Sequence, residues 1–152
     1  MFARLLAAAL LLAVARAGTN AAGQKYLAEN KGKDGVISLP SGLQYKVLRA
    51  GEGGFHPAPS SPCSCHYEGK LIDGTVFDSS YARGSPTTFA PNQVISGWTE
   101  AMQLMVEGDK WEMYIPSELG YGEQVPPRAI PGFSIENAIN VENIPDFLRF
   151  FY

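Results

Sequence analysis

Side chains that commonly carry out covalent or metal chemistry are few in this chain, and their spacing suits neither role. The cysteines and histidines are Cys63, Cys65, His56 and His66. In a strand over residues 63–67, the two cysteines would share a face with their Cα atoms about 7 Å apart, at the upper limit for a disulfide. His66 would point to the face opposite Cys65, so the two are not expected to chelate a metal. We predict two buried free cysteines, no metal site and no cofactor.

Aromatic side chains, by contrast, are spread through the chain beside one possible ion pair. The rings of interest are Tyr67, Phe77, Phe89, Trp98 and Tyr121. Each ring taken alone is compatible with an ordinary hydrophobic core, and the tyrosine at position 121 with a loop anchor. Asp78 could cap the turn at residues 79–80, or pair with Arg83 at a wet surface for under about 1 kcal/mol. Taken singly, these residues leave a binding site and a plain core both open.

Short strands and one helix must hold these side chains in place. Alternating apolar residues and turn signals predict the following strands: 42–48, 63–67, 70–72, 75–77, 87–89 and 110–115. Asp73-Gly74 is a strong hairpin signal between two of them. Apolar residues three or four apart, Trp98 among them, predict a helix that runs from Pro91 and ends at Gly108. Strands lie before and after a single helix, and strands and helices do not alternate along the chain. This order of elements predicts an α+β domain in which an antiparallel sheet covers one helix.

Size and charge limit the kind of protein this is. The chain has 152 residues and a mass of 16.4 kDa, which favours one domain. Hydrophobic residues make up 45% and charged residues 18%, as in a globular protein. The net charge of −3 supplies no basic surface for a phosphate backbone. We therefore expect no nucleic-acid partner.

The first 17 residues have the sequence features of a secretory signal peptide. Arg4 precedes an apolar run of about 11 residues, and Ala15-Arg16-Ala17 matches a small-x-small cleavage site. Such a run spans only about 16 Å as a helix, against roughly 30 Å of bilayer core, so a membrane anchor is the weaker interpretation. We expect cleavage after Ala17, no stable membrane span thereafter, and a location in the secretory pathway: the endoplasmic reticulum lumen, the exterior or a periplasm-equivalent space.

Four short motifs occur in an order that is specific when they are taken together. They are 66–69 (HYEG), 74–80 (GTVFDSS), 94–98 (VISGW) and 121–123 (YGE). In combination they resemble the FK506-binding-protein family of peptidyl-prolyl cis-trans isomerases. Residues 27–48 further resemble the linker and first strand of secreted members similar to the macrophage infectivity potentiator. The resemblance covers about residues 25–130.

This resemblance implies a half-wrapped antiparallel β-sheet around the helix, here residues 93–107, with an apolar pocket between them. It implies catalytic roles for Tyr67, Phe77, Asp78, Trp98 and Tyr121, and substrate-binding roles for Arg83, Phe89, Val94, Ile95 and Ile130. The pocket floor would be the indole at position 98. The phenol at position 121 and the backbone N–H at position 95 would donate hydrogen bonds to carbonyls of the bound segment.

The chemistry of prolyl isomerisation agrees with a site made of rings. An X-Pro bond rotates over a barrier of roughly 18–20 kcal/mol because the planar amide must lose conjugation. No covalent bond breaks, so a dry aromatic pocket that binds the twisted amide better than the planar one is sufficient. The implied partners are proline-containing polypeptide clients and FK506- or rapamycin-type ligands. The alternative is a binding or chaperone module that keeps the pocket but has weak turnover.

The implied domain plan assigns four segments. Residues 1–17 are the signal peptide, 18–38 a short, mobile lead-in helix (20–31) with a linker, 39–146 the isomerase domain and 147–152 an apolar tail that must pack or meet a partner.

The carboxyl-terminal part departs from the family pattern. Ile130-Pro131-Gly132 lacks the second proline of that pattern, and Val125-Pro126-Pro127 has both prolines but comes too early. The last strand is expected over 139–144, with 133–136 as the alternative. Either choice places an asparagine, Asn143 or Asn137, where the family has an apolar residue.

Overall fold

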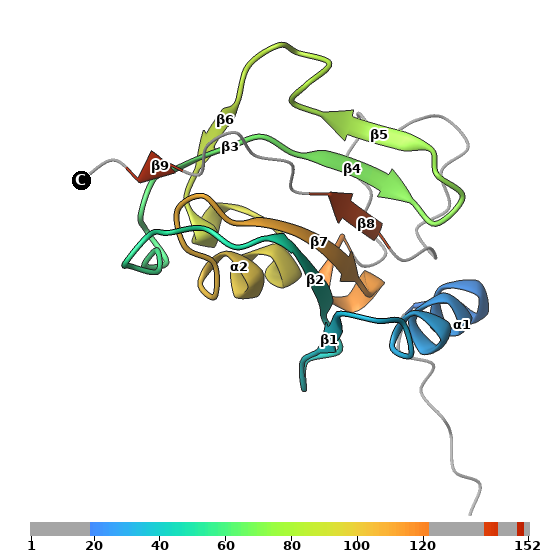
Figure 1. Ribbon diagram of the computed structural model, residues 1–152. Coiled ribbons are helices and arrows are strands. Elements are labelled where there is room, and N and C mark those ends of the chain that lie inside the picture. Colours follow the sequence, from blue (N-terminus) through green and yellow to red (C-terminus); the bar gives the residue numbers. More distant parts are fainter. Residues whose placement is uncertain (1–18, 122–138, 143–148, 151–152) are drawn as a thin grey trace, which may run out of the picture.

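The fold is an antiparallel sheet that curves around one short helix, as predicted (Figure 1). The computed structural model describes residues 19–121, 139–142 and 149–150. The larger sheet holds, in spatial order, β1 (Val36–Ser38), β2 (Gln44–Arg49), β7 (Lys110–Ile115), β8 (Ile139–Glu142), β4 (Glu68–Leu71) and β5 (Val76–Ser79). The smaller sheet holds β6 (Thr87–Phe89), β3 (Cys63–Cys65) and β9 (Arg149–Phe150). Every strand pairing among these described residues is antiparallel.

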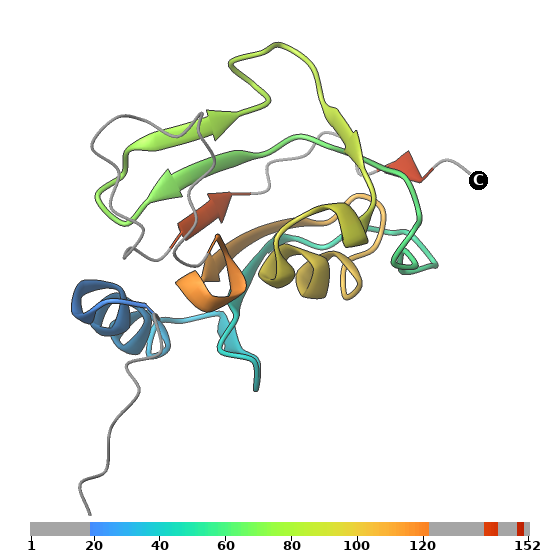
Figure 2. The ribbon, with the colours of Figure 1, turned by 180° about the vertical axis from the view of Figure 1, so that it is seen from behind.

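Helix α2 (Ser96–Met102) packs against β7 and the 3-10 turn η2 (Ser117–Leu119), inside the curve of the sheet (Figure 2). The predicted helix over 93–107 was therefore too long. The chain makes a 3-10 turn, η1 (Pro91–Gln93), and the β-branched Val94 and Ile95 are extended, which their stiff side chains favour. After Met102 the chain continues in tight turns, whose spacing of about three residues imitates a helical pattern.

Several predicted strands have the expected bounds. β6 and β7 match their predicted ranges, and β8 confirms that the last strand of the larger sheet begins at Ile139. Asn143 and the alternative segment 133–136 lie outside the described residues. In the β4–β5 hairpin, the turn residue Gly74 has a φ of 87°, and Asp73 Oδ1 accepts a hydrogen bond from the Thr75 N–H at 2.8 Å. The strands themselves are 68–71 and 76–79, shifted by one or two residues from the prediction.

Two strands were not predicted. β1 pairs with β2 but has only three residues, too few for alternation to show. β9 lies in the apolar tail, and its two residues pair with Cys63 and Ser64 of β3. β3 ends at Cys65, two residues before the predicted end, because the backbone of Tyr67 bonds to Ser80 instead.

The core lies between α2 and the inner face of the sheets. Its fully buried members include Leu43, Met102, Met105, Met113 and Ile115. Cys63 and Cys65 belong to the same cluster, and both are free, as predicted. Burial raises the pKa of the Cys63 thiol to about 11 and that of Cys65 further, so both thiols stay protonated and inert at neutral pH.

Helix α1 (Ala21–Asn30) is capped by Asn20, whose side chain accepts a hydrogen bond from the Gly23 N–H at 2.8 Å. The helix packs over Gln44, on the face of β2 opposite Tyr45 and Val47. Gln44 on that face is buried, accepts a hydrogen bond from Asn30 at 3.0 Å and donates one to the Leu27 carbonyl at 2.9 Å. The predicted lead-in helix is therefore docked on the domain.

Candidate active site

A pocket of about 360 Å³ opens between the β4–β5 hairpin, β6 and α2. Of the catalytic and substrate-binding residues that the resemblance implies, all except Arg83 and Ile130 line this pocket. The lining comprises Tyr67, Gly69, Phe77, Asp78, Phe89, Gln93, Val94, Ile95, Trp98 and Tyr121. Arg83 reaches the pocket edge through Asp78, and Ile130 lies outside the described residues. The chain thus brings together residues that are up to 54 positions apart in sequence, from 67 to 121.

Three rings form the deep wall of the pocket. Trp98, at 7% exposure, meets Tyr67 with ring centroids 5.0 Å apart and Phe89 at 4.8 Å, both at 70° between planes. The other two rings lie 6.1 Å apart in a similar edge-to-face arrangement. These geometries are the favourable ones for aromatic quadrupoles, worth about 0.5–1.5 kcal/mol per pair beyond buried area. The rings therefore support one another as a rigid apolar surface.

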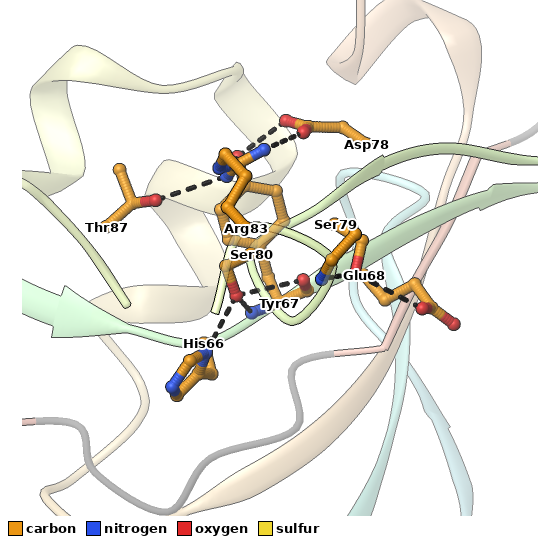
Figure 3. Close-up of polar contacts among 9 residues, drawn as sticks. His66, Tyr67, Glu68, Asp78, Ser79, Ser80, Arg83 and Thr87 are labelled. Carbon is orange, nitrogen blue, oxygen red and sulfur yellow. Dashed lines mark hydrogen bonds and ion pairs between the residues drawn. The ribbon is translucent and has the colours of Figure 1, made fainter. Parts of the chain in front are cut away.

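Beside these rings lies a polar network of three side chains, two of which, Tyr67 and Asp78, line the pocket (Figure 3). The Tyr67 hydroxyl donates to Asp78 Oδ2 at 2.5 Å, and Arg83 forms an ion pair with the other carboxylate oxygen. Arg83 Nη2 also donates to the Tyr67 hydroxyl at 2.8 Å and to Thr87 Oγ1 at 3.2 Å. Its guanidinium carbon lies 5.4 Å from the Tyr67 ring centroid. Asp78 therefore pairs with Arg83. From the sequence alone, Asp78 could equally have capped the turn at residues 79–80.

The network keeps Asp78 ionised. Partial burial disfavours the charged carboxylate, but hydrogen bonds from Tyr67 and Arg83, together with the Arg83 charge, outweigh it and lower the pKa of Asp78. Burial first, and then the bond to Asp78, raise the pKa of the Tyr67 phenol. A carboxylate that is ionised and fully engaged at neutral pH is unsuited to general acid or base work.

Acid stability is expected to depend on Asp78. The folded-state pKa of this carboxyl lies below its unfolded value of about 3.9, so its stabilisation is fully present above that pH and is lost as pH falls through the folded pKa. The Asp78→Asn variant should therefore show a smaller fall in Tm than the parent between about pH 5 and pH 2.5. Circular dichroism melts across that range measure the difference, and parallel acid curves for the two proteins would refute the assignment.

A second polar cluster holds the backbone of Tyr67. The fully buried Ser80 hydroxyl accepts from the Tyr67 N–H at 2.8 Å and donates to the Tyr67 carbonyl at 3.2 Å. His66 Nδ1 lies 2.9 Å from the same hydroxyl, and Ser79 donates to Glu68 at 3.3 Å (Figure 3). Ser80 was missed as a supporting residue because a serine in a turn-rich segment carries no sign of burial.

Gly69 and Gln93 also line the pocket and were not expected there. Gly69 lies opposite Asp78 in the β4–β5 pairing, and an added Cβ would come within 2.5 Å of Phe77 Cζ. The Phe77 ring therefore rests on bare backbone. A glycine inside a strand is a usable signal of such close approach. Gln93 accepts a hydrogen bond from the Ala90 N–H at 2.8 Å and so fixes the η1 turn at the pocket edge.

Prolyl isomerisation is the activity that the resemblance implies, and its kcat/KM is expected to be lower by about threefold or more in the Gly69→Ala variant, because the Phe77 ring must swing from its seat and change the pocket shape. Overpacking of this kind costs roughly 1–3 kcal/mol, so the domain should still fold. Gly54→Ala is the matched control, since an added Cβ there meets nothing within 4 Å. Equal activity in the two variants would show that the seat of the Phe77 ring does not matter.

Tyr121 lies at the mouth of the pocket and is 38% exposed. Partial burial, and secondarily the charge of Asp78, raise the pKa of its phenol. The hydroxyl therefore stays protonated across the neutral range and is able to donate a hydrogen bond. Within the described residues, no three His, Cys, Asp or Glu side chains are grouped so that they could hold a metal ion.

The comparisons with known proteins agree with this geometry. The family model described as FKBP-type peptidyl-prolyl cis-trans isomerase matches residues 53–135, more than half of the chain. This chain belongs to that family. A second model, for the domain amino-terminal to FKBP-type peptidyl-prolyl isomerase, matches residues 7–47.

Individual relatives of this FKBP-type chain are similar over three quarters of its length. It is 56% identical over 114 residues to the FKBP-type 22 kDa peptidyl-prolyl cis-trans isomerase of Escherichia coli, and 45% identical over 119 residues to the macrophage infectivity potentiator of Trypanosoma cruzi. Each alignment covers 75% of this chain, but only 55% and 61% of the respective relative. The chain thus spans little more than half the length of these curated relatives.

Solved structures show the same fold. The crystal structure of FkpA from Escherichia coli matches with a TM-score of 0.73 and 36% identity, covering 86% of this chain and 58% of that one. A peptidyl-prolyl cis-trans isomerase from Pseudomonas syringae pv. tomato matches with a TM-score of 0.67 and 32% identity, covering 84% and 92%. In the described part of this FKBP-type chain, no helix has the length and apolarity needed to cross a bilayer.

Proposed function

We propose that this protein accelerates the cis-trans rotation of X-Pro bonds in polypeptide clients. The observation that carries the proposal is the rigid aromatic pocket over Trp98, with the Tyr67, Asp78 and Arg83 network beside it. Membership of the FKBP-type family and a pocket of this composition support the same activity.

In the proposed mechanism, the prolyl ring enters the pocket and rests on the indole of Trp98. The planar amide carries charge separation that the twisted amide lacks, so a dry, ring-lined surface favours the twisted form. The Tyr121 hydroxyl and the Ile95 N–H would donate hydrogen bonds to client carbonyls and hold the chain on either side of the rotating bond.

The roles of the charged pair are structural in this proposal. Asp78 fixes the Tyr67 ring through its hydroxyl, and Arg83 neutralises the carboxylate at the pocket edge. No proton needs to move, because rotation about the amide breaks no covalent bond. Phe77, Phe89 and Val94 complete the wall against which the prolyl ring packs.

The proposed ligands and location follow from the pocket and the leader. Besides proline-containing clients, an apolar pocket of about 360 Å³ suits FK506- and rapamycin-type compounds. Residues 1–17 support cleavage of a signal peptide and entry into the secretory pathway. One of the similar relatives, from Legionella longbeachae, is named an outer membrane protein.

The test is a proline-peptide isomerisation assay on the chain produced with its own leader. Catalysed rotation that FK506 inhibits is the expected result. Tight drug binding without acceleration would instead favour the alternative, a binding or chaperone module with weak turnover. The absence of both would refute the proposed pocket function.

A further inference from the structure

The segment before helix α1 contacts the chain that leads to the mouth of the pocket. Thr19 is 4% exposed, and its hydroxyl donates to Glu118 Oε2 at 2.6 Å while accepting from the Ser117 N–H at 2.8 Å. The residues joined are 98 and 99 positions apart. One small hydroxyl thus satisfies a buried backbone N–H and a carboxylate at the same time, and both would lose a partner without it.

The contacted turn leads directly to Tyr121. In η2, Leu119 N–H bonds to the Pro116 carbonyl at 2.9 Å and Gly120 N–H to the Ser117 carbonyl at 3.0 Å. An added Cβ on Gly97 would meet Leu119 Cβ at 3.2 Å, so this turn is also packed tightly on α2, beside Trp98. The turn therefore sets where the chain leaves toward the pocket mouth.

Helix α1 is a firm base for the Thr19 contact because its middle and far end are also held. Tyr26 meets Tyr114 of β7 with ring centroids 6.1 Å apart. At the carboxyl end, Gln44 of β2 bonds to Asn30 and to the carbonyl of Leu27. The helix thus spans from β2 to η2, and Thr19 transmits that rigidity to the turn.

We propose that Thr19 is a positioning residue for Tyr121: its hydroxyl clamps the η2 turn and thereby places the phenol at the pocket mouth. This inference rests on the proposed function, because the phenol is assigned there to the binding of client carbonyls. It links the segment before the domain to the site, although Thr19 does not itself line the pocket.

Turnover gives the first measurement, on the chain produced with its own leader. Thr19→Val keeps the size of the side chain but removes the hydroxyl, and it should raise KM about threefold with little change in kcat. Thr19→Ser should restore the parent KM. In a Tyr121→Phe background, Thr19→Val should have no further effect, since interacting residues are not additive. Full additivity in that background would overturn the proposal.

A spectroscopic readout separates this inference from the proposed activity. NOEs between the Tyr121 ring and other pocket side chains should weaken in Thr19→Val and return in Thr19→Ser. Trp111→Phe is the control, because it weakens the stack of Trp111 on Tyr45 without touching Thr19, α1 or the pocket lining, and it should keep these NOEs at a comparable loss of Tm. Unchanged NOEs in Thr19→Val, or an equal loss in the control, would overturn the clamp. If the parent protein shows no turnover, the NOE comparison still decides the clamp while the proposed activity fails.

Should Thr19→Val fail to fold, Glu118→Gln tests the same clamp. It keeps the size of the side chain but weakens the hydrogen bond that the Thr19 hydroxyl donates. The same KM increase and loss of NOEs are expected, and parent-like values would count against the proposal.

Discussion

Replacing Trp98 by leucine is expected to lower kcat/KM for prolyl isomerisation by about tenfold. The indole lines the pocket, of which it is the proposed floor, and makes two edge-to-face contacts, with Tyr67 and Phe89. These contacts hold the indole where the prolyl ring is proposed to rest, so leucine should bind the twisted amide less well. A loss of about 1.4 kcal/mol in transition-state binding corresponds to a factor of ten in rate. Steady-state kinetics with a proline peptide measure the effect.

The second tryptophan supplies a matched control for that substitution. Trp111 is 5% exposed and stacks on Tyr45 with centroids 4.2 Å apart, but it does not line the pocket. Trp111→Leu should lower the free energy of unfolding about as much as Trp98→Leu while keeping most of the activity. Similar activity losses in the two variants would mean that stability, rather than the pocket floor, explains the effect.

The second large effect is expected from Gly97→Ala, which should destabilise the domain. An added Cβ would lie 2.7 Å from Ile115 Cγ2, and that side chain is fully buried in β7. Alanine gains about 1 kcal/mol in helix propensity, but overpacking costs roughly 1–3 kcal/mol and the contacted residue cannot move aside. The overpacking cost should win, so urea or thermal unfolding should show a net loss of stability.

Activity should fall in the same Gly97→Ala variant, because α2 must shift away from the sheet and carries Trp98 with it. Gly54→Ala again provides the comparison, since its added Cβ meets nothing within 4 Å. A Gly97→Ala protein as stable and active as this control would show that the contact between α2 and β7 tolerates an extra methyl group.

Much of the architecture could be predicted from sequence because the alternation is strong where one face of a strand is buried. β7 is the clear example, with Trp111, Met113 and Ile115 all buried on one face. Alternation did not reveal that Gln44 of β2, although polar, is buried under α1. A polar side chain that is buried under a helix, with its hydrogen bonds made to that helix, gives the same alternating pattern as a polar side chain exposed to solvent.

The ends of the helical segment were harder to predict. The pattern of apolar residues continues on both sides of α2, yet Val94 and Ile95 are extended and the residues after Met102 form turns. The spacing of apolar residues shows which residues face the core. Turns that pack on the core have the same spacing as a helix, so the spacing alone does not show where a helix ends. Strand β1 was missed for the opposite reason, since three residues are too few to show a period.

Most of the pocket lining was expected from the family resemblance, whereas Gly69, Gln93 and the supporting residues were not. Ser80, Gly69 and Thr19 act through a buried hydroxyl, a missing side chain and a contact about 98 residues away in sequence. Only the tertiary structure brings such partners together. The residue types of Ser80 and Thr19 give no sign of the role, whereas a glycine inside a strand, as at Gly69, does signal a close approach.

The most direct test of the central claim is the turnover of one variant that loses three pocket side chains together, Phe77→Leu, Trp98→Leu and Tyr121→Phe. The apolar pocket is proposed to do the catalysis, so this protein should remain folded by circular dichroism and rotate prolyl bonds no faster than the uncatalysed rate. Parent-like turnover in the folded triple variant would contradict the account.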